Sequence, residues 1–121
     1  MLEKEVIENT LKFSNNEVAS KILKQYKNST IVNREFTGVG FFTYFQIDDK
    51  KLFLKDNSSL KIGGIHAEIN GLKYGAGFIL FVENGAINNL EGYSYGDDGW
   101  PEVITDYKLY LVNSDGSLTE L

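Results

Sequence analysis

The sequence predicts an α+β fold, with one or two N-terminal helices packed on a mainly antiparallel sheet of five to seven strands. Apolar residues recur at helical spacing as far as Lys27, and from Thr30 onward the period of the pattern changes to two. Asn84-Gly85 lies between two apolar runs and is the strongest short-range signal of a β-hairpin. We expect one α+β domain over residues 1-121.

The helical region is predicted to present one apolar face, formed by Ile7, Leu11, Val18, Ile22 and Tyr26. The pattern is interrupted near Ser14, which has the spacing of a capping box with Glu17. We therefore predict two helices, over residues 2–12 and 15–27, that cover the sheet. One bent helix is the alternative.

The rest of the chain reads as strands separated by turns. The predicted strands are 30–36, 39–47, a short edge at 52–54, 60–69 with a bulge at Gly63-Gly64, 75–83, 86–95, 104–112 and 117–121. A two-residue turn at Asn84-Gly85 would set Val82 opposite Ile87 and Phe78 opposite Glu91. Both faces of this hairpin would then be apolar in the middle, which predicts central strands covered on both sides.

Composition restricts the possible functions. The formal net charge is −5 and the chain has no Cys, which excludes disulfides and thiolate metal sites. An acidic chain is repelled by nucleic-acid phosphates, so we expect no nucleic-acid partner. The N-terminus lacks signal-peptide character and no apolar run is long enough for a membrane span, so we expect a soluble cytoplasmic protein without a membrane partner. We expect no cofactor and no metal.

Three residues are candidate catalytic groups. His66 and Glu68 are two apart on a predicted strand and share a face, as an acid/base pair or half of a metal site would. The alternative is a surface pair or a hydrogen-bonded core pair, and one His without thiolates is a poor start for zinc. Glu91 is predicted among apolar neighbours, where it would act as a general base, a polar anchor or a structural carboxylate.

A second candidate site combines aromatic and acidic residues. Aromatic side chains beside carboxylates suit the recognition of a cationic or protein partner. They equally suit a loop that folds over the sheet edge. The residues concerned are Tyr93, Tyr95, Asp97, Asp98, Trp100 and Glu102.

The run HAEINGLKYGAGFILFVENGAINNLEGYSY…WPE, preceded by GVGFFT at Gly38 to Thr43, resembles a recurring block of small uncharacterised bacterial proteins. The resemblance covers Gly38 to Glu102, over half of the chain. Some such families look like immunity proteins encoded beside secreted toxins, and no catalytic residues carry over from them.

These observations favour a non-enzymatic protein-interaction module, of the toxin-neutralising immunity type, whose partner has a basic surface. The alternative is a small hydrolase-like enzyme that uses His66 with Glu68 or Glu91. An enzyme should bring these groups into one cleft, whereas a binding protein should expose an aromatic and acidic patch. The oligomeric state does not follow from the sequence.

Overall fold

The computed structural model describes residues 2–121 and confirms the α+β fold, with two helices packed on an antiparallel sheet. The helices are α1 (Leu2–Ser14) and α2 (Glu17–Lys27). The strands are β1 (Thr30–Phe36), β2 (Gly40–Gln46), β3 (Leu60–Ile62), β4 (Ile65–Ile69), β5 (Ala76–Glu83), β6 (Ala86–Ser94), β7 (Tyr107–Val112) and β8 (Leu118–Glu120). Within residues 2–121 neither helix is long and apolar enough to cross a membrane.

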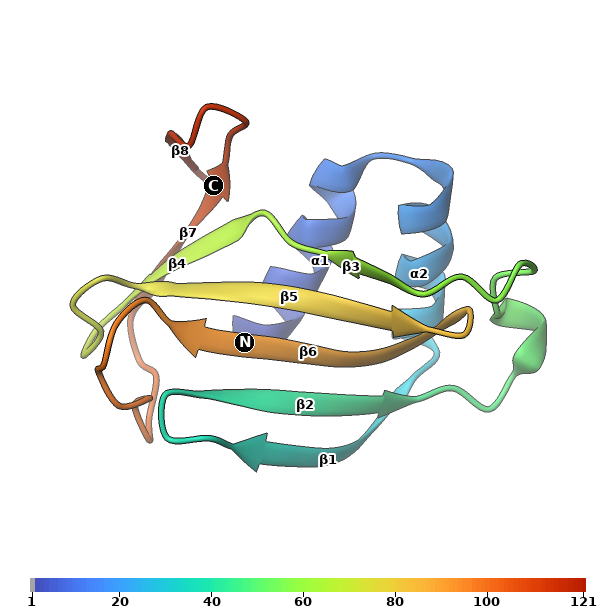
Figure 1. Cartoon of the computed structure of the whole chain (residues 1–121), viewed down its shortest axis with the longest axis horizontal. Coiled ribbons are helices and arrows are strands. Elements are labelled where there is room, and N and C mark those ends of the chain that lie inside the picture. Colours follow the sequence, from blue (N-terminus) through green and yellow to red (C-terminus); the bar gives the residue numbers. More distant parts are fainter. Residues whose placement is uncertain (1) are drawn as a thin grey trace.

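The sheet has eight strands in the order β1-β2-β6-β5-β4-β7-β8, with β3 also paired to β5 (Figure 1). The predicted strand 60–69 is two strands, because Gly63-Gly64 interrupts it: β3 pairs with β5, whereas β4 pairs with both β5 and β7. The predicted edge strand 52–54 is wrong. That segment ends the 3-10 helix η1 (Lys50–Leu52) and turns the buried Leu54 into the core.

Both helices cover the same side of the sheet, behind the strands in Figure 1. The core between them contains Ile7 and Leu11 of α1, Ile22 of α2, and Leu80 and Leu90 of the central strands. The prediction that the central hairpin is covered on both sides is therefore wrong. On the other side Ile79, Phe81 and their neighbours remain half-buried.

The chain forms two helices as predicted, but the turn between them is made differently. Asn16, rather than Ser14, is the N-cap of α2, and its Oδ1 accepts a hydrogen bond of 2.7 Å from the Ala19 amide. Ser14 belongs to α1 and donates to the Thr10 carbonyl. The break resets the helical phase, so α2 buries Ala19 and Ile22 while Val18 is 38% exposed.

A buried glutamine fastens α2 to the hairpin end of the sheet. Gln25 is fully buried, and its Nε2 donates to the carbonyls of Leu52 (2.8 Å) and Gly85 (2.9 Å). Its Oε1 accepts from the Ile87 amide at 2.7 Å. All its polar atoms have partners, so these hydrogen bonds offset the cost of removing the amide from water, and they fix the helix against the turn.

The Asn84-Gly85 turn is confirmed: both residues have positive φ, and Glu83 pairs with Ala86. The predicted register beyond it is wrong. Val82 pairs with Ile87 but Phe81 pairs with Asn89, so Asn88 is an extra, bulged residue. The bulge exchanges the two faces of β6, because side chains alternate along a strand. Glu91 consequently lies opposite Ile79 rather than Phe78.

Candidate functional site

The side of the sheet opposite the helices is the candidate functional surface, here called the open face. Pairing registers define its members, since directly paired residues share a face. They are Asn33, Glu35, Phe42, Tyr44, Lys61, His66, Glu68, Gly77, Ile79, Phe81, Glu83, Asn89, Glu91, Tyr93, Lys108, Tyr110 and Glu120. The apolar and aromatic members are half-buried, so they combine to form an uncovered surface.

An aromatic row crosses this face, formed by Tyr93, Tyr95, His66 and Tyr110. The His66 imidazole stacks on Tyr95, with ring centroids 5.5 Å apart and planes inclined by 9°. Tyr95 meets Tyr93 edge-on at 5.6 Å, and His66 meets Tyr110 at 5.8 Å. Such contacts hold the rings in defined orientations. The row is thus a continuous feature of the surface.

Two glycines of the β5 region make room for the aromatic row. A Cβ atom at Gly77 would overlap the hydroxyl groups of Tyr93 and Tyr95. A Cβ atom at Gly75 would lie 2.6 Å from the His66 ring, and Gly75 has a positive φ of 80°. These glycines therefore allow the side chains of His66, Tyr93 and Tyr95 to approach the backbone of the sheet closely.

The titratable groups of the aromatic row influence one another. Partial burial lowers the pKa of His66, and the nearby Glu68 carboxylate offsets only part of that effect. Tyr110 donates a hydrogen bond to Glu68, which, with burial and the negative charges of Glu68 and Glu120, raises the pKa of Tyr110 to about 12. Both shifts favour the neutral forms of His66 and Tyr110.

The three predicted catalytic candidates do not come together. His66 and Glu68 share the open face of β4, as predicted, and both line a groove of about 830 Å³ between the β4–β5 connection and β7. Glu91 lies two strands from His66 and two residues further along, which places their Cα atoms about 12 Å apart. A site containing His66, Glu68 and Glu91 in one cleft is therefore absent.

The predicted aromatic and acidic cluster is divided between the two sides of the sheet. Tyr93 and Tyr95 belong to the open face, but Trp100 packs on Phe41 of the core at 5.2 Å between ring centroids. Glu102 lies beside Trp100 in a small hollow on that side. The Asp98 carboxylate accepts from the Lys73 amide and fastens two loops together. Asp97 is exposed in the same loop.

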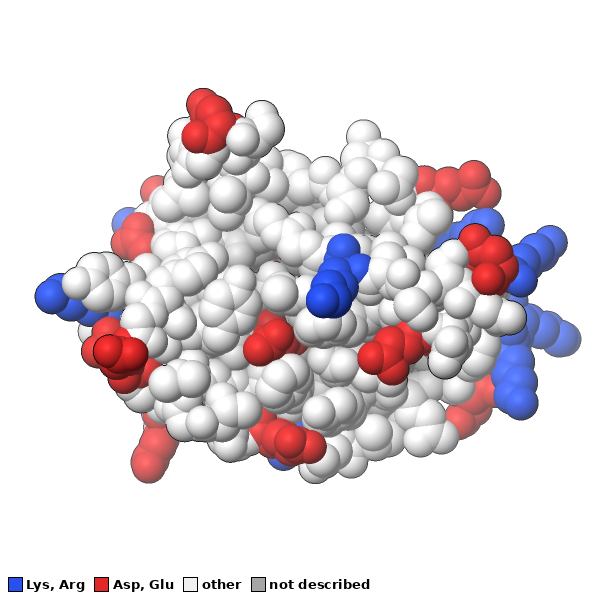
Figure 2. Space-filling view, in the orientation of Figure 1, with Lys and Arg blue, Asp and Glu red and all other residues white. Residues whose placement is uncertain are grey.

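Charge is distributed unevenly over the molecule. The open face carries Glu35, Glu68, Glu83, Glu91 and Glu120 against Lys61 and Lys108. Figure 2 shows this face, with acidic groups scattered among uncharged ones and basic groups gathered at the end where α2 and η1 lie. The open face therefore attracts cations at long range, although Lys108 partly neutralises Glu68 across the β4–β7 pair.

Asn89 is a polar residue of the open face with unusual surroundings. It pairs with Phe81 and Tyr44 on the neighbouring strands and is 8% exposed. Its Nδ2 donates to Asn88, whereas its buried Oδ1 has no hydrogen-bond partner among residues 2–121. A buried acceptor without a donor is costly, so such a group is often associated with function.

Sequence reasoning found His66, Glu68, Glu91, Tyr93 and Tyr95 but missed the other aromatic residues of this surface. The missed residues are Phe42, Tyr44, Phe81 and Tyr110. They alternate along their strands with residues that are equally apolar, so the alternation of apolar residues did not indicate which face of the sheet would be left uncovered. The bulge at Asn88 left no signal in the sequence.

Among residues 2–121, no group of three or more His, Asp or Glu side chains is placed to hold a metal ion. No family model matches the chain, and neither a curated protein nor a solved structure matches it.

Proposed function

We propose that this protein is a non-enzymatic interaction module whose open face binds a basic protein. The observation that carries the proposal is the aromatic and acidic composition of a sheet face that no helix covers. Aromatic side chains supply large contact area at little entropic cost, and surrounding carboxylates select a positively charged partner. A secreted basic toxin would be such a partner, which agrees with the immunity-type resemblance.

The unpartnered Asn89 Oδ1 supports the same proposal. A donor from a partner that reached this acceptor would satisfy a buried group that has no hydrogen-bond partner among residues 2–121. Tyr44 and Phe81 beside it would be covered at the same time. The open face thus has both apolar area and a polar group to gain from association.

The test is an NMR titration of the protein with the basic proteins encoded next to its own gene. We expect amide shifts confined to β2, β6, β5 and β4, and Phe81→Ser should weaken binding at least about tenfold, as truncation of a central aromatic does. Phe36→Ser is the matched control, since Phe36 is 69% exposed on β1 and projects to the other side. Shifts on another surface, or no binding to any of these proteins, would contradict the proposal.

A second candidate function is hydrolysis that uses His66 with Glu68. It is favoured by one observation, that the side chains of His66 and Glu68 line the same groove. His66→Asn would then abolish the hydrolysis of a panel of ester and amide substrates. A binding module predicts no His66-dependent turnover of any substrate in such a panel.

A further inference from the structure

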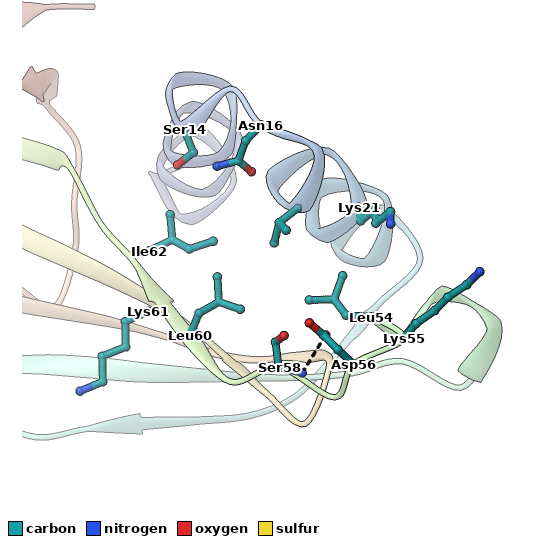
Figure 3. A pocket seen from close by; sticks show the side chains of 11 residues that line it. Ser14, Asn16, Lys21, Leu54, Lys55, Asp56, Ser58, Leu60, Lys61 and Ile62 are labelled. Atoms are coloured by element: carbon teal, nitrogen blue, oxygen red, sulfur yellow. Dashed lines mark hydrogen bonds between the residues drawn. The ribbon is translucent and has the colours of Figure 1, made fainter.

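A hollow of about 590 Å³ lies between the α1–α2 turn and the segment that leads into β3, away from the open face. Its apolar wall is formed by Val18, Leu54, Leu60 and Ile62. Figure 3 shows Leu54, Leu60 and Ile62 pointing into it. The volume falls within the range of about 300–1,000 Å³ that is usual for small-ligand sites.

The wall of this hollow suits an alkyl chain. Its apolar members are all aliphatic, so no aromatic ring offers a flat surface for stacking. Val18 is 38% exposed, while Leu60 and Ile62 are half-buried, so this apolar area meets water in the free protein. A ligand methylene chain would remove that area from water without any change in the packed core.

The surroundings of the hollow are strongly basic, in contrast to the rest of the chain. Helix α2 and the segment 50–61 together hold seven of the twelve basic residues and only two of the seventeen acids, Glu17 and Asp56. These two segments thus carry a net charge of +5, and the remainder of the chain carries −10. The Asp56 carboxylate is already engaged, since it accepts from the Ser58 amide.

The lysines stand at the mouth of the hollow rather than inside it. Lys21, Lys55 and Lys61 line the rim, and Figure 3 shows their side chains extending away from the apolar wall. Lys61 reaches the open face, where its Nζ lies 5.4 Å from the centre of the Phe81 ring. Lys21 lies 3.3 Å from Glu17 in an exposed pair, which leaves it able to exchange partners.

We propose that this hollow binds a single-chain amphiphile with an anionic head group, such as a free fatty acid. The alkyl chain would lie on Val18, Leu54, Leu60 and Ile62. The carboxylate would remain at the mouth, in the field of Lys21 and Lys55. This site is separate from the open face and does not depend on the function proposed for it.

The first test compares three amphiphiles of equal chain length below their micellar concentrations: decanoate, decanol and decyltrimethylammonium. Methyl NMR spectra would follow Val18, Leu54, Leu60 and Ile62. We expect saturable shifts of these methyl groups with decanoate and weaker binding of the other two. Absence of saturation with decanoate, or binding of the cation as tight as that of the carboxylate, would overturn the proposal.

The second test separates the two halves of the site. Lys21→Gln with Lys55→Gln should weaken decanoate binding about fivefold, as expected for the loss of two exposed charge contacts. Lys4→Gln with Lys108→Gln changes the net charge equally but lies away from the hollow, and should have little effect. Val18→Trp should block the hollow and abolish the methyl shifts. Equal effects of the two lysine pairs would contradict a local role for Lys21 and Lys55.

A third measurement distinguishes a free amphiphile from a lipid surface. The protein would be sedimented with phosphatidylglycerol vesicles and, separately, with phosphatidylcholine vesicles. We expect that the Val18→Trp variant and the parent protein sediment to the same extent with either kind of vesicle. Sedimentation with the anionic vesicles, together with no saturable binding of decanoate, would overturn the proposal and assign the basic end to membrane contact.

Discussion

At the scale of single residues, Glu68 sets the protonation behaviour of the open face. It accepts the Tyr110 hydrogen bond that raises the pKa of this phenol, and its charge partly counteracts the effect of burial on the pKa of His66. Both influences come from one carboxylate on one strand. Removing its charge without changing its shape therefore separates electrostatics from packing.

Glu68→Gln should lower two pKa values at once. The pKa of Tyr110 should fall from about 12 toward its ordinary value near 10, and the pKa of His66 should fall further below 6.5. Ring signals in NMR titrations of parent and variant would measure both. Glu91→Gln, on the same face but remote from His66, should change neither. An unchanged Tyr110 titration in Glu68→Gln would disprove the hydrogen bond.

The sign of the pH effect on stability follows from the lowered pKa of His66. Below 6.5 the unfolded chain takes up a proton at this residue before the native protein does. Stability is therefore lost as pH falls from 6.5 through the folded pKa, and His66→Gln should lessen that loss. Urea unfolding at pH 7 and pH 5 would test this, and a steeper pH dependence in the variant would contradict it.

At the scale of the elements, the hairpin turn and the helix α2 hold the molecule together where they meet. Gln25 links α2 to both the η1 loop and Gly85, and the Gly85 carbonyl also accepts from the Leu54 amide at 2.8 Å. The turn is thus packed under other elements rather than exposed at a loop tip. Its backbone conformation affects the helix as well as the sheet.

Gly85→Ala should destabilise the protein more than Gly116→Ala. Both glycines have positive φ, at 82° and 88°, which costs an L-residue about 1–2 kcal/mol. At Gly85 the new Cβ atom would also lie 2.7 Å from the Leu54 carbonyl oxygen, whereas at Gly116 nothing lies within 4 Å. Chemical denaturation of the two variants would measure the difference. Equal losses in the free energy of unfolding would mean that the Asn84-Gly85 turn accommodates the new Cβ atom without disturbing the residues packed around it.

Substitutions on α2 should report which of its faces is packed. Ile22→Ala should cost about 2–4 kcal/mol, because Ile22 is completely buried and a cavity would remain. Val18→Ala should cost less than about 0.5 kcal/mol, since Val18 faces the hollow and solvent. Urea unfolding would measure both. A similar loss in the two variants would contradict the phase of the helix described above.

At the scale of the whole molecule, the separation of charge gives the protein two different surfaces. The end formed by α2 and residues 50–61 is basic, and the remainder is acidic and includes the open face. A net charge of −5 conceals this division. Each surface should therefore select ligands of opposite charge, a cationic protein on one and an anionic amphiphile on the other.

Salt should weaken association of the open face with the basic protein proposed as its partner, mainly through the association rate. Raising the ionic strength from about 0.05 M to 0.5 M shortens the Debye length, so long-range attraction is screened while close apolar contacts persist. Stopped-flow or surface-plasmon kinetics would show a lower association rate and a nearly unchanged dissociation rate. If the whole loss of affinity at high salt came from a faster dissociation, the charges would act only in the bound state.

The sequence by itself determined the α+β class, the break between the helices, and the type I′ turn at Asn84-Gly85. Each follows from local chemistry: the spacing of apolar residues, the polar interruption at Ser14 to Asn16, and the need for positive φ in a two-residue turn. It also identified the pairing of His66 and Glu68 on one face, because the period of a strand requires it.

Only the tertiary structure decided which face of the sheet is covered and what lies on the other. The bulge at Asn88 moved Glu91 away from Phe78 and placed it opposite Ile79, and no residue type in this stretch requires a bulge there. Strand order kept Glu91 from His66, while loop packing sent Trp100 to the core side. These features depend on contacts between segments distant in the sequence, where many alternative pairings satisfy the same local pattern.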